Sequence, residues 1–389
     1  MNLSISIVGL PNVGKSTLFN ALLKKQQALA ANYPFATIEP NVGIVPVPDS
    51  RLEKLADIVE RDSSASLGMT KRPPIKPATV EFYDIAGLVK GASEGEGLGN
   101  KFLSHIRETK IISHVVRAFE DPDVIKEGAV DPKSDYEVIN AELILADLAT
   151  AENAQSKVKK FTTDSEKSAI KKLIDGLNSG KPAREIEFEK EEQDFINNLF
   201  LLSSKPEIVV LNVSEADYNP TGIDRITNKY SELLFPVTAN EARQSQEIAS
   251  SHASRNDNIV VICAKIESEL SELSTEEQME YLKDLGLESS GLERLIQKAY
   301  ETLGLISFLT AGEKEVRAWT IRKGSTAPEA AGEIHTDFTK KFIKAEVVGF
   351  DDFVINNGWK GAREKGKARL EGKEYVMKDG DIVEFKIGS

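Results

Sequence analysis

The chain has 389 residues, of which 40% are hydrophobic and 29% are charged, so a packed protein of two or three domains is expected. No apolar run reaches the roughly 18 residues of a membrane-spanning helix, and the N-terminus lacks the features of a signal peptide, so a cytoplasmic protein is expected. The net charge of −13 argues against a protein that coats nucleic acid, and the single cysteine, Cys263, excludes an intrachain disulfide.

The first expected elements are a short buried strand at residues 5–9 and a helix at residues 15–25, in which apolar residues recur at helical spacing. Helical stretches separate most of the further strand candidates, which lie at residues 79–84, 113–119, 207–212 and 258–263. Strands that alternate with helices predict an α/β fold with a mostly parallel sheet that is covered on both faces.

Residues 136–203 interrupt this alternation. The segment is rich in Glu, Lys, Ala and Leu, has no strand pattern, and carries apolar helical faces on both sides of a Ser-Gly-Lys-Pro break at 179–182. This pattern predicts two antiparallel helices that form an inserted coiled-coil arm. The simpler interpretation, covering helices of the same domain, stays open.

The pattern changes again after residue 303. A small α+β module is predicted from a helix within residues 327–342 and from three strand candidates, at residues 316–321, 345–350 and 381–387. The sequence therefore predicts a discontinuous α/β domain, the arm and a C-terminal domain, at residues 1–135 with 204–303, 136–203 and 304–389.

Residues 9–17, Gly-Leu-Pro-Asn-Val-Gly-Lys-Ser-Thr, match the P-loop pattern G-x-x-x-x-G-K-[ST] between a predicted strand and a predicted helix. In that context the motif predicts a site for a nucleoside triphosphate. Main-chain N–H groups would surround the phosphates, Lys15 would reach the β- and γ-phosphates, and the Ser16 hydroxyl would bind Mg²⁺. The predicted phosphate-binding residues are Asn12, Val13, Gly14, Lys15, Ser16 and Thr17.

Elements downstream indicate a nucleotide-dependent switch. Thr37 lies where a switch threonine completes the Mg²⁺ coordination. Asp84 and Gly87 match D-x-x-G, in which Asp84 would hold Mg²⁺ through water and the Gly87 N–H would contact the γ-phosphate. Leu88 follows, where many switch GTPases have a glutamine that orients the attacking water. The leucine side chain cannot hydrogen-bond water. Hydrolysis is therefore expected either to rely on another group or a partner, or to have a very slow intrinsic rate.

The base-recognition segment departs from that of guanine-binding proteins, which usually carry N-K-x-D. Here Asn212 is kept, Val213 replaces the lysine and Glu215 replaces the aspartate. The longer carboxylate moves the acceptor away from the guanine N–H groups, and a mismatched donor–acceptor pattern disfavours a base strongly. Ala264, in Cys-Ala-Lys at 263–265, resembles the S-A-K loop that lines the base. We therefore expect ATP to be preferred over GTP, although a degenerate guanine site stays an alternative.

Together these segments resemble the YchF subfamily of Obg-like P-loop proteins, and the resemblance covers nearly the whole chain. The P-loop is joined by Asn-Tyr-Pro-Phe-Ala-Thr-Ile-Glu-Pro at 32–40, Asp-Ile-Ala-Gly-Leu-Val-Lys-Gly-Ala-Ser at 84–93, Gly-Glu-Gly-Leu-Gly-Asn at 95–100 and Asn-Val-Ser-Glu at 212–215. The segments at 310–320 and 331–338 resemble that family's C-terminal TGS module.

The resemblance implies a nucleotide domain, a helical coiled-coil arm and a β-grasp (ubiquitin-like) TGS domain. It implies ATP hydrolysis, with GTP as the poorer ligand, and binding to ribosomes, with a role as a switch in translation or stress regulation. It also carries Lys15, Ser16, Thr37 and Val213 into nucleotide and Mg²⁺ roles. A monomer is expected.

One departure from the family pattern concerns hydrolysis. Lys126 stands about where the family has a histidine that is proposed to assist it, and His105 and His114 are the substitutes worth testing as catalytic residues. His114 lies in a strand-like run, which favours a buried structural role, and His105 on a helix is equally consistent with the surface.

A basic run at residues 360–373 has six Lys and Arg residues against Glu364 and Glu371, beside Trp359. Such a run is suited to rRNA phosphates, although a solvated charged face is an equal alternative. At the level of function, two other hypotheses stay open: a GTPase with relaxed base specificity, and a non-catalytic ribosome or RNA adaptor that nucleotide stabilises.

Overall fold

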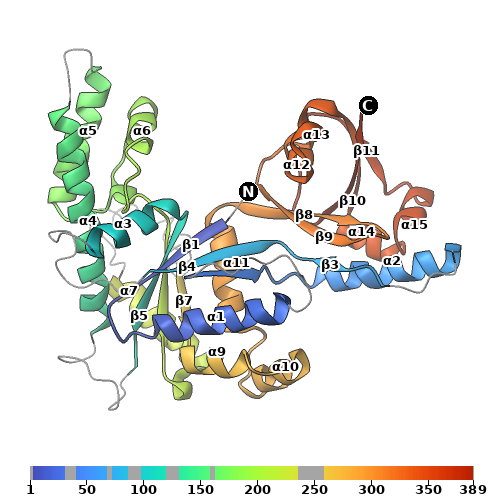
Figure 1. Ribbon diagram of the computed structural model, residues 1–389, viewed down its shortest axis with the longest axis horizontal. Helices are drawn as coiled ribbons and strands as arrows, with labels where there is room; N and C mark the ends of the chain where they lie inside the picture. Colours follow the sequence, from blue (N-terminus) through green and yellow to red (C-terminus); the bar gives the residue numbers. More distant parts are fainter. Residues whose placement is uncertain are drawn as a thin grey trace, which may run out of the picture. The chain divides into compact units, whose positions relative to one another are not determined.

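The computed structural model describes residues 3–30, 41–67, 72–85, 98–119, 131–157, 163–234 and 258–388 (Figure 1). The chain forms two compact units, the first from Leu3–Val45 with Glu81–Lys298 and the second chiefly from Pro46–Val80 with Ala299–Ser389. Within the described ranges, no helix is long and apolar enough to cross a membrane. The two units are described separately below.

The first unit is built on a six-stranded sheet of order β2-β4-β1-β5-β6-β7. Its strands are β1 (Leu3–Val8), β2 (Val42–Pro46), β4 (Thr79–Asp84), β5 (Ile111–Arg117), β6 (Glu207–Asn212) and β7 (Ile259–Ile262). The four strands from β1 to β7 pair in parallel, and every residue in them is buried, as a parallel sheet covered on both faces requires. This arrangement confirms the predicted α/β fold.

Helices follow the strands and pack on them (Figure 1). They are α1 (Lys15–Ala30), α3 (Leu98–Glu108), α7 (Pro220–Leu234), α9 (Ala264–Leu270), α10 (Thr275–Asp284) and α11 (Gly291–Thr302). A short 3-10 helix, η2 (Glu215–Asp217), follows β6. Because the parallel strands all end at the same edge of the sheet, the loops after β1, β5, β6 and β7 meet there.

The helical insertion is present, and it contains more than two helices. Helix α4 (Pro132–Ser156) packs beside α5 (Asp164–Asn178), and the chain returns through η1 (Ala183–Glu185) and α6 (Lys190–Asn197). Asp131 caps α4 ahead of a proline at its first position, and Thr163 with Glu166 forms a capping box on α5. The predicted break at 179–182 coincides with the end of α5.

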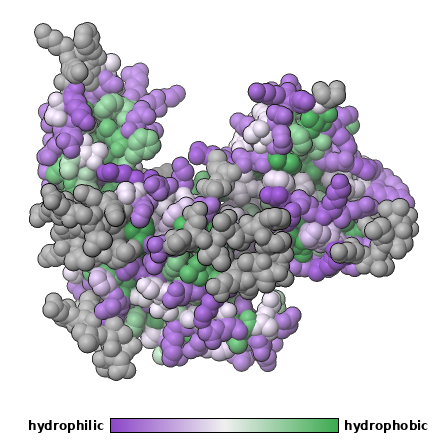
Figure 2. Space-filling view, viewed as in Figure 1, coloured by the Kyte–Doolittle hydropathy of each residue, from purple (hydrophilic) through white to green (hydrophobic). Residues whose placement is uncertain are grey.

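The arm has a hydrophobic core of its own, formed where α4, α5 and α6 face one another. Figure 2 shows hydrophobic residues gathered over α5 and α6. The buried members are Ile144, Ala151, Ala169, Leu173, Leu177, Ala183, Ile196 and Leu201. Clustering of contacts places the arm in the first unit, so its status as a separate domain stays a prediction.

The second unit has a six-stranded sheet of order β11-β10-β12-β8-β9-β3. Its strands are β3 (Ile75–Lys76), β8 (Leu305–Ala311), β9 (Val316–Arg322), β10 (Phe342–Gly349), β11 (Arg369–Glu371) and β12 (Asp381–Ile387). Its helices are α2 (Arg51–Leu67), α12 (Ala327–Ile334), α13 (Thr336–Lys341), α14 (Phe350–Ile355) and α15 (Trp359–Glu364). The helix expected within 327–342 is therefore two helices, since His335 is extended between them.

The two units also differ from the predicted domains in that residues 46–80 belong to the second unit, whose C-terminal part begins at Ala299. Strand β3 pairs in parallel with β9, and the Val316 N–H donates to the Pro74 carbonyl at 3.0 Å. The Arg51 guanidinium also binds Asp379, 2.7 Å away. A strand of two residues has no sequence periodicity, so no pattern in the sequence indicates which sheet it joins.

Candidate functional site

The loop between β1 and α1 has a backbone that only particular residues can adopt. Gly14 has φ +98°, and Asn12 has φ +61°, a value that asparagine tolerates better than most residues. A Cβ atom on Gly14 would lie 2.3 Å from the Asn212 Nδ2, and one on Gly9 would lie 2.4 Å from the Val115 carbonyl oxygen. The two glycines of the motif are thus required by close packing against neighbouring strands.

Asn212, at the end of β6, joins this loop to the end of β7. Its Nδ2 donates to the Val13 carbonyl at 2.9 Å, and its Oδ1 accepts from the Ala264 N–H at 2.9 Å. Both side-chain groups of Asn212 are therefore used within the protein, and Val13 is buried beneath the loop. The role of Asn212 in this structure is to hold three segments together.

A cavity of about 540 Å³ opens at this edge of the sheet. It is lined by Asn12, Gly14, Lys15, Ser16, Thr17, Phe119, Asn212, Val213, Ser214, Glu215, Cys263, Ala264 and Lys265. Nine of the thirteen predicted site residues in the described ranges line it, from loops that are far apart in sequence, whereas Val13, Asp84, His105 and His114 do not. Phe119 and Ser214 were not predicted as site residues, and Cys263 and Lys265 were named only as neighbours of Ala264 in the loop at 263–265. Each follows a strand end of this edge or neighbours a predicted residue, which is the signal that would have found them.

Lys15 is the buried charge of the cavity. Its Nζ donates to the Leu10 carbonyl at 2.6 Å. Burial lowers the Lys15 pKa to about 8, although the nearby Asp84 carboxylate acts in the opposite direction. Burial likewise raises the pKa of Asp84, and Lys15 opposes that shift. The Lys15 ammonium has three N–H donors, and its burial has already removed most of its water. It can therefore bind an anionic group in the cavity with little further desolvation cost.

Glu215 and Lys265 form an ion pair on the rim of the cavity. Glu215 lies in η2 after β6, and Lys265 lies in the first turn of α9 after β7. Both side chains are at least half exposed, so the pair adds little to stability. The pairing places the Lys265 ammonium beside the Glu215 carboxylate, which was predicted to select the base.

The residues present suit Mg²⁺. Ser16 offers a hydroxyl to the cavity and Asp84 lies close enough to influence Lys15, so the nearby donors are the oxygen ligands that Mg²⁺ prefers beside phosphates and water. The part of the chain that the structure describes holds no cluster of three or more His, Cys, Asp and Glu residues that would bind a metal without a ligand. Thr37, Gly87, Leu88 and Lys126 lie outside the described residues.

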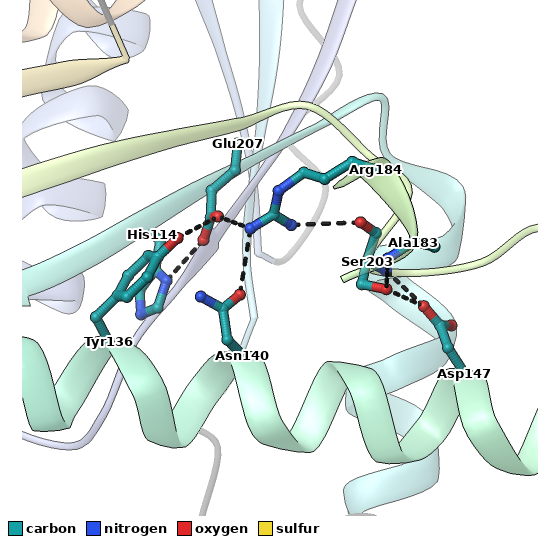
Figure 3. Close-up of polar contacts among 8 residues, drawn as sticks. All are labelled: His114, Tyr136, Asn140, Asp147, Ala183, Arg184, Ser203 and Glu207. Atoms are coloured by element: carbon teal, nitrogen blue, oxygen red, sulfur yellow. Dashed lines mark hydrogen bonds and ion pairs between the residues drawn. The ribbon is translucent and has the colours of Figure 1, made fainter. Parts of the chain in front are cut away.

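The two histidines proposed as catalytic candidates do not line the cavity. His105 is exposed in the last turn of α3. His114 is buried in β5, where its Nδ1 lies 2.8 Å from Glu207 and its ring stacks on Tyr136 at 5.0 Å (Figure 3). The alternative interpretation of His114, a buried structural residue, agrees with this geometry.

The basic run of the C-terminal region is partly neutralised within the second unit. Arg363 binds Glu346 and Glu384, at 2.7 Å and 3.0 Å, and Lys367 lies 3.1 Å from Asp352. These cations are held by carboxylates, so the run is less available to phosphates than its composition predicts.

The strand, P-loop and helix, with a cavity at the carboxyl ends of parallel strands, define a P-loop nucleoside triphosphatase fold. Residues 4–146 match the family described as 50S ribosome-binding GTPase. Residues 305–388 match the YchF GTPase C-terminal family, whose description is a protein of unknown function.

Relatives match along the whole chain. It is 48% identical over 394 residues to the ribosome-binding ATPase YchF of Bacillus subtilis, and 46% identical over 393 residues to that of Haemophilus influenzae, with 99% of both sequences covered each time. The structure of the Schizosaccharomyces pombe YchF GTPase matches with a TM-score of 0.78 at 37% identity, covering 99% of this chain and 98% of that one. The chain belongs to the YchF family.

Proposed function

We propose that this protein is a ribosome-associated ATPase that binds ATP with Mg²⁺, binds GTP more weakly, and changes its switch segments with the state of the nucleotide. The observation that carries the proposal is the cavity, where the P-loop presents the buried ammonium of Lys15 beside the Ser16 hydroxyl. The association with ribosomes rests on the names of the bacterial relatives, which are described as ribosome-binding ATPases.

Each group at the site has a task in this proposal. Main-chain N–H groups of the P-loop and the N-terminus of α1 would hold the phosphates, and Lys15 would balance their charge. Mg²⁺, when bound by Ser16 and through water by Asp84, would neutralise charge on the phosphate oxygens. Val213 and Phe119 line the same cavity and offer apolar contact to a purine ring.

The preference for ATP has support on the rim. Guanine recognition needs a free carboxylate that accepts two N–H groups, and the Glu215 carboxylate is paired with Lys265. The N–H groups of guanine would compete with that cation for the carboxylate, whereas adenine has no such requirement. A GTPase with relaxed base specificity remains the second candidate, because the fission yeast relative is described as a GTPase.

Competition binding of ATP, ADP, GTP and GDP to the full-length protein with Mg²⁺ tests the base preference, and phosphate release with and without ribosomes tests the activity. We expect tighter binding of ATP than of GTP, and faster release of phosphate from ATP when ribosomes are present. Tighter binding of GTP by tenfold would contradict the base assignment. Binding without ribosome-stimulated turnover would instead favour a nucleotide-stabilised adaptor.

A further inference from the structure

A second buried polar cluster of the first unit lies at the root of the helical arm (Figure 3). We call it the arm-root cluster, and it consists of His114, Tyr136, Asn140, Arg184 and Glu207. The Glu207 carboxylate is its centre. It accepts hydrogen bonds from the His114 Nδ1 at 2.8 Å and the Tyr136 hydroxyl at 3.1 Å, and it forms an ion pair with Arg184.

The members of the cluster come from four separate elements. His114 lies on β5, Tyr136 and Asn140 lie one turn apart on α4, Arg184 lies in η1, and Glu207 begins β6. The Arg184 guanidinium also reaches the Asn140 Oδ1 at 3.4 Å. One carboxylate thus joins two central strands to the first turns of the arm and to the turn between α5 and α6.

The partners of Glu207 in this cluster stabilise its charged form. Burial opposes the charge of Glu207, but the Arg184 guanidinium and the hydrogen bonds from His114 and Tyr136 outweigh it, so the pKa falls to about 2. A buried carboxylate with three partners has one favoured geometry, because moving any partner leaves a charge or polar group unpaired. The cluster therefore resists displacement of α4 relative to β6.

A second buried carboxylate fixes the same part of the arm without contacting β6. The Asp147 carboxylate, on α4, accepts hydrogen bonds from the Leu202 and Ser203 N–H groups at 2.7 Å and from the Ser203 hydroxyl at 2.6 Å. The Ser203 Oγ in turn accepts from the Ala183 N–H at 2.9 Å. The Ser203 carbonyl also accepts from the Arg184 guanidinium at 3.3 Å, so Asp147 is joined to the arm-root cluster through Ser203, and Asp147 provides a comparison in which Glu207 keeps its own partners.

Strand β6 connects the arm-root cluster to the cavity. Glu207 is its first residue, and Asn212, which bridges the P-loop and α9, is its last. Five steps along a strand span about 17 Å. The strand pairs with β5 along its whole length and with β7 from Val209 onward, and it is buried throughout, so we expect it to move as a unit.

We propose that Glu207 is a positioning residue for the nucleotide site, which holds β6 between the arm and the cavity and so couples displacement of the arm to nucleotide affinity. The inference rests on the proposed function of the cavity. A partner that shifts α4 would change the hold of Asn212 on the P-loop. By thermodynamic reciprocity, nucleotide in the cavity would also stabilise the root of the arm.

Amide hydrogen exchange of the full-length wild-type protein tests the reciprocal effect, measured with and without Mg²⁺ and ATP, ADP or GTP. We expect nucleotide to slow exchange in the P-loop and also in α4 at residues 136–147, which do not line the cavity. Protection that is confined to the P-loop and its neighbours, in a protein saturated with nucleotide, would overturn the proposal without any variant being needed.

Three variants test the residue itself. Glu207→Gln keeps the shape and removes the charge that Arg184 requires, and we expect the nucleotide Kd to rise about fivefold or more. Tyr136→Phe, which keeps the ring stacked on His114, should raise it less. Asp147→Asn removes an equally buried carboxylate of the arm, and its Kd should stay within about twofold of the wild-type value.

The outcomes separate the two proposals. If Glu207→Gln is folded and binds nucleotide as the wild type does, or if Asp147→Asn weakens binding as much at a similar loss of stability, the positioning role is wrong. If the wild-type protein binds none of the nucleotides, the proposed function of the cavity fails instead. Loss of the α4 protection in Tyr136→Phe, with nucleotide still bound, would support the coupling.

Discussion

Among the charged side chains that the first unit buries, Lys15 at the cavity and Glu207 at the root of the arm have opposite surroundings. Glu207 has a guanidinium, an imidazole and a hydroxyl as partners, and its pKa falls to about 2. Within the described part of the chain, the Lys15 ammonium donates to one acceptor, the Leu10 carbonyl, and its pKa falls to about 8 because burial disfavours its charge.

The difference separates a charge that holds the fold from a charge that is prepared for a ligand. A buried group whose charged form is stabilised by protein partners contributes to the native state, and removing one partner is costly. A buried cation whose charged form is disfavoured costs stability by itself. It gains that free energy back when an anion binds. Three experiments can break or sharpen this comparison.

The largest expected effect is on nucleotide affinity. Lys15→Met should weaken binding of ATP by about a hundredfold or more, because it removes a desolvated cation from the phosphates. The free energy of unfolding should stay the same or rise, since the variant buries no charge. Isothermal titration calorimetry and denaturant unfolding check both parts. Lys24→Met, at an exposed position of the same helix, is the control and should change neither value appreciably.

The second effect is on stability. Arg184→Met leaves the Glu207 charge buried without its guanidinium, which should lower the stability of the first unit by about 3–5 kcal/mol. Hydrogen exchange of the β5 and β6 amides measures this loss within that unit. Arg225→Met removes an arginine from an exposed pair with Asp217, and should cost at most about 1 kcal/mol. Equal losses in the two variants would show that the arm-root cluster is not special.

The smallest effect is a difference in pH dependence. The Lys15 pKa is 10.5 before folding and about 8 in the fold, so the unfolded chain binds more protons between these values, and stability should rise with pH across that window. The rise should be at most about 3 kcal/mol, measured as wild type minus Lys15→Met. Glu207 affects stability at acidic pH: its contribution to the free energy of unfolding is present above about pH 4.5 and is lost as pH falls toward 2. A flat difference curve between pH 8 and 10.5 would contradict the burial of a charged Lys15.

Much of the first unit was predictable, because its signals are local. The P-loop motif, strands β4 and β6 and the helical character of the arm follow from patterns a few residues long. The residues of the cavity were predictable for the same reason, since each follows a strand of a parallel sheet. The ion pair of Glu215 with Lys265 was not, because nothing in the sequence states that two loops 50 residues apart place their charges side by side.

The arm-root cluster and the second unit show what local patterns omit. His114 was considered as a catalytic candidate. Only the fold reveals that its ring is hydrogen-bonded to Glu207 and stacked on Tyr136. The short strand β3 and helix α2 lie within the sequence of the nucleotide domain, yet they complete the sheet and packing of the C-terminal region. Partners that lie far apart in sequence decide these assignments, and the sequence pattern records only one side of each contact.

The membership of residues 46–80 in the second unit has a consequence for how the chain is made. Ile75 pairs with Val316, so β3 leaves the ribosome well before its neighbour exists. At synthesis rates of about 5–20 residues per second, β3 and α2 wait on the order of 10–50 s for the rest of their sheet. During that time their apolar faces are exposed to chaperones or to neighbouring chains. The second unit is thus expected to fold only after translation is nearly finished, and a fragment that begins at residue 304 would lack an edge strand and a covering helix.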